Sequence, residues 1–161
     1  MLLKSVRDEF VFHCQSRKLS PKTVNNYTKQ LEYLINYLEV EKDTKHIDDV
    51  EPKFIKQFLV SMTKMGRKTN YVNDLLKCYK VFFRYAYEEG YTETLLTDGI
   101  HNQKKEKVIL RTFSDAELKK LINFYQGHDY LTIRNKVSMM LLIDTGIRLS
   151  ELTGLTEEQI K

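Results

Sequence analysis

Apolar side chains recur at steps of three and four residues over most of the first 90 positions of this 161-residue chain. That spacing places them on one face of an α-helix, whereas a half-buried strand would alternate at every second residue. Charged loops and helix-boundary residues interrupt the pattern, which divides it into four amphipathic helices. We expect these helices over residues 2–17, from Pro21 through Leu38, from Val50 to Gly66, and around an apolar face from Val72 to Ala86. Four helices with short connections and a shared core predict a compact all-α bundle.

The ends of these helices carry the expected chemistry. Ser20 suits an N-cap and Pro21 suits a first helical position, so the second helix is predicted to begin there. Residues 42–49 are charged and lack periodicity, which predicts a loop. Gly66 follows the third apolar stripe, where a glycine commonly ends a helix.

The last fifty residues predict two further helices. Ser114 and Glu117 form a capping-box pattern that opens a helix, and Phe113 stands where a hydrophobic staple would lie. The run from Val137 to Ile143 has too few polar interruptions for a solvent-facing side, so it predicts a helix that is buried all round. A unit of about fifty residues cannot cover such a helix, and we therefore expect self-association or another partner surface there.

An arginine follows this apolar helix at a predicted bend. Gly146 should end the helix in the left-handed conformation, and a second helical segment should restart around Arg148. A guanidinium there can hold a phosphate through two parallel hydrogen bonds, assisted by the dipole of the next helix. Glu151, three residues later, is expected on the same helical face, where it can orient Arg148. An ordinary surface ion pair explains these two residues equally well.

Positive charge gathers in the middle of the chain and on predicted outer helix faces. Residues 100–111 hold four Lys and Arg against one Glu, within a chain of net charge +4. Basic and amide side chains off the apolar stripes are the types that contact DNA phosphates and bases, although such faces are often merely solvated. The candidate DNA-binding residues are Lys22, Asn25, Asn26, Lys29, Arg67, Lys68, Thr69, Lys77, Lys80, Arg84, Lys104, Lys105 and Lys107.

Several other classes of function find no support in the residues. The longest apolar run is too short to cross a bilayer, and charges come too early for a signal peptide. Cys14 and Cys78 fall on or beside apolar faces, which favours buried thiols and a cytoplasmic protein. The histidines are scattered, and no glycine-rich phosphate loop is present. We therefore expect no metal, no cofactor and no small-molecule substrate.

Residues 145–155, T-G-I-R-L-S-E-L-T-G-L, resemble the first arginine box of the tyrosine recombinases, or phage integrases, whose pattern is T-G-x-R-x-S-E-L. The first four helices also resemble the core-binding domain that precedes the catalytic domain in this family. The matching residues are 19–24, Tyr27, Leu31, Tyr37, Leu38, Thr69, Asn70, 82–86, Gly90 and Tyr91. Family members often continue with Asn-Pro, whereas residues 93–99 here contain no proline.

The resemblance implies a core-binding domain at residues 1–98, a basic linker at 99–111 and the helical start of a catalytic domain at 112–161. It also implies that Arg148 holds the scissile phosphate and that Glu151 supports it. Family members cut DNA through a covalent phosphotyrosine, without metal or cofactor. The 13 residues after Arg148 contain no Tyr, His or Arg, so the nucleophile and the remaining catalytic boxes have no counterpart in this chain.

We therefore expect the DNA-binding portion of a truncated recombinase that does not cleave double-stranded DNA alone and that assembles as a multimer on it. Two alternatives remain at this stage. One is a non-catalytic DNA-binding protein that occupies recombination sites. The other is a helical interaction module in which Arg148 and Glu151 are purely structural.

Overall fold

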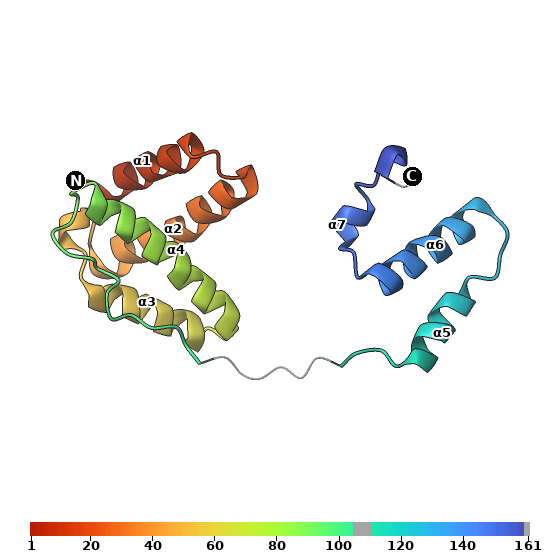
Figure 1. The fold of residues 1–161 in the computed structure, drawn as a ribbon. Helices are drawn as coiled ribbons and strands as arrows, with labels where there is room; N and C mark the ends of the chain where they lie inside the picture. Colours follow the sequence, from red (N-terminus) through yellow and green to blue (C-terminus); the bar gives the residue numbers. More distant parts are fainter. Residues whose placement is uncertain (105–110, 160–161) are drawn as a thin grey trace. The chain divides into compact units, whose positions relative to one another are not determined.

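A computed structural model describes residues 1–104 and 111–159, and these fall into two compact units, residues 1–107 and 108–161 (Figure 1). The first unit contains α1 (Leu3–Ser16), α2 (Pro21–Lys42), η1 (Ile47–Asp49), α3 (Pro52–Lys64) and α4 (Thr69–Glu88). The second contains α5 (Asp115–Phe124), α6 (Tyr130–Thr145), α7 (Leu149–Leu152) and η2 (Glu157–Gln159). The described ranges contain no named strand, only an isolated bridge between Leu2 and His46. The predicted all-α fold is confirmed.

The four long helices of the first unit enclose one hydrophobic core. Phe10 of α1 is buried in it, in edge-to-face contact with Phe82 of α4 at 5.5 Å between ring centroids. The apolar stripes predicted from the sequence are the buried ones, including Leu31, Leu34, Ile35 and Leu38 of α2. Ser20 caps α2 as predicted, since its Oγ accepts a hydrogen bond from the Thr23 N–H at 3.2 Å.

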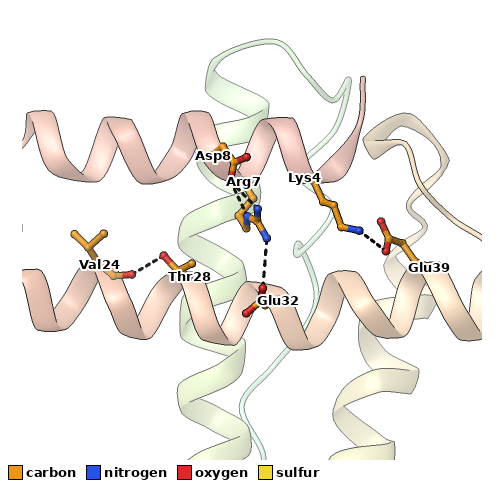
Figure 2. Close-up of polar contacts among 7 residues, drawn as sticks. All are labelled: Lys4, Arg7, Asp8, Val24, Thr28, Glu32 and Glu39. Carbon is orange, nitrogen blue, oxygen red and sulfur yellow. Dashed lines mark hydrogen bonds and ion pairs between the residues drawn. The ribbon is translucent and has the colours of Figure 1, made fainter.

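Polar contacts join α1 to α2 along the edge of this core (Figure 2). Lys4 Nζ lies 2.7 Å from Glu39 Oε2, and Arg7 lies between Asp8 at 2.7 Å and Glu32 at 3.9 Å. Exposed pairs of this kind contribute little to stability, about 0–1 kcal/mol each. Burial of the apolar stripes therefore holds the bundle together, and these pairs favour one alignment of the two helices.

The loop at residues 42–49 is more ordered than predicted. It ends in the short helix η1, and Ile47 within it is buried in the core. The Ile47 N–H donates to the Met1 carbonyl at 2.9 Å, and the Leu3 N–H donates to the Lys45 carbonyl at 2.9 Å. A single apolar residue among charged ones carries no periodic signal, which is why the sequence predicted only a loop.

The chain after α4 folds back along the bundle (Figure 1). Leu96 and Ile100 are buried in the core, and the side chain of Asn73 in α4 bonds to the backbone of Gln103 at both ends. The Asn73 Nδ2–H donates to the Gln103 carbonyl at 2.9 Å, and the Gln103 N–H donates to Asn73 Oδ1 at 2.8 Å. Ile100 and Gln103 therefore attach the start of the predicted basic linker to the first unit, whereas Gly99, His101, Asn102 and Lys104 are exposed.

The second unit has no such core. No residue of α5, α6 or α7 is buried, and Leu131, Ile133 and Val137 of α6 are at least half exposed. The described residues of this unit do not cover α6, as expected for a unit of about fifty residues, so burial of the Val137–Ile143 run on all sides would need another surface. The capping box is confirmed, since Ser114 N–H donates to Glu117 Oε2 at 2.8 Å. Within the described ranges, no helix has the length and apolar character needed to cross a membrane.

Candidate nucleic-acid interface

The bend before Arg148 forms as predicted. Gly146 ends α6 at φ 64°, in the left-handed region that glycine adopts without a Cβ clash. Its N–H donates to the Leu142 carbonyl at 3.2 Å, and Thr145 Oγ1 donates to the Leu141 carbonyl at 2.6 Å. Thr145 Oγ1 also accepts from the Ile147 N–H at 3.2 Å, so the threonine hydroxyl ties both sides of the bend together.

Arg148 lies at the start of α7 and is held by Glu151 through two contacts. The guanidinium Nη1 lies 2.9 Å from Glu151 Oε1, and the Arg148 backbone N–H donates to Glu151 Oε2 at 2.9 Å. The predicted pairing is present, but the shared helical face is wrong, because Arg148 is the N-cap residue in an extended conformation. The predicted dipole contribution also fails, because α7 has only four residues. The Arg148 side chain is 81% exposed, which leaves its other donors open to an anion.

The polar face of α2 presents its predicted residues to solvent. Lys22, Asn25, Asn26 and Lys29 are all exposed, and they recur at three- and four-residue steps along one side of the helix. The opposite side is the core stripe. This arrangement leaves two ammonium groups and two amides together on one surface strip, which is the mixture that reads a DNA groove and its flanking phosphates.

The turn between α3 and α4 holds a second group of predicted residues. Arg67 and Lys68 are exposed, whereas Thr69 is half-buried at the first position of α4. The Arg67 guanidinium lies 5.7 Å from the centroid of the Tyr71 ring, a cation–π contact that orients it.

The outer face of α4 carries Lys77, Lys80 and Arg84. Lys77 pairs with Asp74 at 3.1 Å, which reduces its value as a free cation. Lys80 and Arg84 line a hollow between α4 and the end of α1, together with Arg17, a residue that the sequence analysis did not select. At 1.5 Å per residue, Arg84 is about 24 Å along α4 from Lys68, so these two candidate DNA-binding residues are too far apart to contact the same phosphate.

Of the three candidate linker residues, only Lys104 is described. It is exposed and follows Gln103, the residue tied to Asn73. Lys105 and Lys107 lie outside the described residues.

Buried titratable groups of the first unit belong to its core. Burial raises the pKa of the Cys78 thiol to about 12, and burial likewise raises the pKa of Tyr79, whose hydroxyl donates to the Gln30 carbonyl at 3.1 Å. A phenol that is sequestered and already hydrogen-bonded in this way is not positioned to attack a phosphate. Tyr79 is therefore a core aromatic.

One family model matches about half of the chain. Residues 8–90 match the model of the phage integrase N-terminal SAM-like domain. That range begins within α1 and ends just after α4, so it includes the faces described above.

Curated relatives and solved structures extend the similarity over nearly the whole chain. The tyrosine recombinase XerC of Pseudomonas syringae pv. tomato is 25% identical over 95% of this chain and 51% of the relative. The tyrosine recombinase XerD of Halalkalibacterium halodurans is 27% identical over 92% of this chain and 50% of the relative. The chain thus spans about half the length of these relatives.

Among solved structures, a lambda integrase dimer bound to a COC′ core site superposes with a TM-score of 0.80 at 21% identity, covering 100% of this chain and 56% of that one. The Tn1549 transposon integrase in complex with a circular intermediate DNA gives a TM-score of 0.74 at 20% identity, covering 98% of this chain and 49% of that one. Similarity at this level of identity establishes a shared fold.

Proposed function

Because the chain belongs to the phage integrase family of tyrosine recombinases, we propose that it is the DNA-binding portion of a site-specific recombinase. The observation that carries this proposal is the placement of exposed cations and amides on α2, α4 and the α3–α4 turn, within the domain that the family model covers. Cations on an outer face bind DNA by displacing the counterions that surround its phosphates, and amides at the same surface can contact base edges.

In this proposal the two units have different roles. The bundle grips duplex DNA, and residues 112–161 form the start of a catalytic domain whose contribution is the Arg148–Glu151 pair. Basic residues between the units, including Lys104, follow the phosphate backbone. A guanidinium held on one side by a carboxylate, and otherwise exposed, is suited to clamp a phosphate and to stabilise negative charge that develops on it.

Strand cleavage needs more than this pair. A nucleophile and a donor for the leaving oxygen are both required, and the residues around Arg148 supply neither. We therefore propose that this polypeptide binds DNA without cutting it, and that it needs no metal or cofactor to bind.

The exposed apolar face of α6 supports assembly with another protein surface. Ile133, Val137 and Met140 follow one another at four- and three-residue steps along one side of α6 and expose between 42 and 50% of their area, and large apolar patches on a small unit usually mark interfaces. We propose self-association on DNA, in keeping with the dimeric lambda integrase complex that shares this fold. A DNA substrate and two free, buried cysteines favour the cytoplasm as the compartment.

Titration of a labelled DNA duplex at several salt concentrations tests the DNA-binding proposal. The affinity should fall steeply as salt rises, with a slope that counts the phosphates contacted. Replacing Arg67 and Lys68 together by Ala should weaken binding to all sequences alike and reduce that slope by about two. A matched control removes the same charge from the same unit by replacing the exposed Lys45 and Lys53.

If the wild-type chain does not bind duplex DNA at low salt, the proposal fails and the helical interaction module becomes the better account. If it binds DNA and the continuous gene encodes no further catalytic boxes, the non-catalytic DNA-binding protein is favoured.

A further inference from the structure

The end of α1, the first turns of α2 and the second half of α4 surround a hollow on the first unit. Its floor is aromatic, since the half-buried Tyr27 and Tyr85 lie on either side of the buried Phe10, at 5.8 and 5.4 Å between ring centroids. Its rim carries Arg17, Lys80 and Arg84. The remaining lining residues are His13, Cys14, Leu19, Val81 and Glu88.

Charge in this hollow favours an anionic ligand. Three cations face one carboxylate, Glu88, among the described residues that line it. Within the described part of the chain, neither Arg17, Lys80 nor Arg84 forms an ion pair at 4 Å or less, in contrast to Lys77 on the same helix. Tyr27 and Tyr85, which also line the hollow, are phenols that can serve as neutral donors. Cations with open donors can bind the anionic phosphate oxygens of a nucleic-acid backbone, and neighbouring phenols can contact its sugars.

The hollow is part of a longer track across the unit. Lys80 and Arg84 also line a second hollow with Leu95 and residues 97–101, which include both Asp98 and His101. On the other side, Leu19 is shared with a depression at the start of α2 that includes Asn25. The track therefore connects the predicted polar face of α2 to the basic face of α4, and Arg17 lies where the two meet.

The backbone at this corner is unusual in one respect. Helices α1, α3 and α4 end in the same hydrogen-bonded turn, in which the residue after the cap adopts a positive φ. That residue is Gly66 after α3 and Gly90 after α4, both at φ 78°, but after α1 it is Lys18 at φ 56°. A left-handed conformation costs a residue with a Cβ about 1–2 kcal/mol relative to glycine. Asp43, which ends α2 at φ 48°, is the other non-glycine residue at positive φ in the described chain. At the end of α1 this turn places the exposed Lys18 directly beside the exposed Arg17.

We propose that Arg17 and Lys18 form a phosphate-contacting corner, which binds the backbone of the duplex DNA strand whose neighbouring phosphates reach Lys80 and Arg84. This inference rests on the proposed DNA-binding function and adds a contact from the α1–α2 corner to those predicted on α2 and α4. The corner aligns the strand across the hollow, so its contribution is to affinity and register rather than to base identity.

Salt-dependent binding of the full chain to a labelled duplex tests the corner directly. Arg17→Gln should lower the magnitude of the salt slope by about 0.9, which corresponds to a loss of about eightfold in affinity at 0.1 M salt relative to the 1 M reference. Lys18→Gly should give a similar loss while retaining the turn, because glycine adopts the positive φ freely. Arg17→Lys keeps the charge and should largely retain the slope.

Lys45→Gln is the matched control. Lys45 is exposed on the same unit, but its carbonyl accepts from Leu3 at the opposite end of the 14-residue α1, about 20 Å from Arg17. It should bind as the wild type does, and circular dichroism should show that all four variants retain their helix content. If Arg17→Gln and Lys18→Gly bind DNA with the same salt slope as the wild type, the phosphate contact proposed for Arg17 and Lys18 is wrong, but the proposed DNA-binding function stands. Failure of the wild type to bind DNA would overturn both.

Discussion

Asn73 should act as the clamp that holds residues 95–103 on the bundle. It is almost fully buried in α4, and its amide bonds to both the N–H and the carbonyl of Gln103, in the manner of a strand pair. Gln103 in turn donates from Nε2 to Thr63 Oγ1 of α3 at 2.8 Å. Leu96 and Ile100 hold the start of this segment in the core, so replacing Asn73 by Ala should release its end around Gln103.

The expected cost follows from the two hydrogen bonds. Each contributes about 1 kcal/mol net, and the truncation adds a small cavity in the core, so the free energy of unfolding should fall by about 2–3 kcal/mol. Gln103 is only partly buried, so water can reach its freed groups and limit the penalty. For a unit of about 100 residues this is a drop in Tm on the order of 10 °C.

Thermal unfolding by circular dichroism and hydrogen exchange of the Gln103 amide measure the two parts of this prediction. The amide should be protected in the wild type and should exchange rapidly in Asn73→Ala. Asn70→Ala is the control, since Asn70 is an exposed asparagine of the same helix, and its loss should change stability little. Equal Tm values for the two variants, or an equally protected Gln103 amide, would refute the clamp.

Three further predictions concern single residues. Lys18→Gly should raise the free energy of unfolding by about 0.5–1 kcal/mol in urea titrations, because relief of the left-handed strain exceeds the added entropy of the unfolded chain. The hydrogen bond to Glu9 raises the pKa of Tyr91 to about 12; unfolding therefore releases a proton above pH 10, and the stability advantage of wild type over Tyr91→Phe should be full below pH 10 and lost as the pH rises through 12. Arg148→Gln should leave the helix content and the unfolding midpoint unchanged, because the side chain is exposed, but should reduce the salt slope of DNA binding by about one if this arginine reaches a phosphate.

Local signals in the sequence were enough to predict the helices of the first unit and where several of them begin or end. Ser20 caps α2, Gly66 follows α3 at positive φ, and Gly146 ends α6, all as their residue types predict. These features depend on contacts within four or five residues, which a pattern along the chain records directly. The pairing of Arg148 with Glu151 is equally local, and the predicted helix restart is present, although Arg148 is its N-cap residue and does not share a helical face with Glu151.

By itself, the sequence determined the all-α class, the stripes that form the core and the residue types able to contact DNA, because each is encoded in periodicity or in side-chain chemistry. Only the tertiary structure decided that Asn73 is bonded to Gln103, thirty residues away, and that Arg17 faces the same hollow as Lys80 and Arg84. Such contacts join distant segments, and their formation depends on which surfaces the folded units leave uncovered, which no short-range pattern expresses.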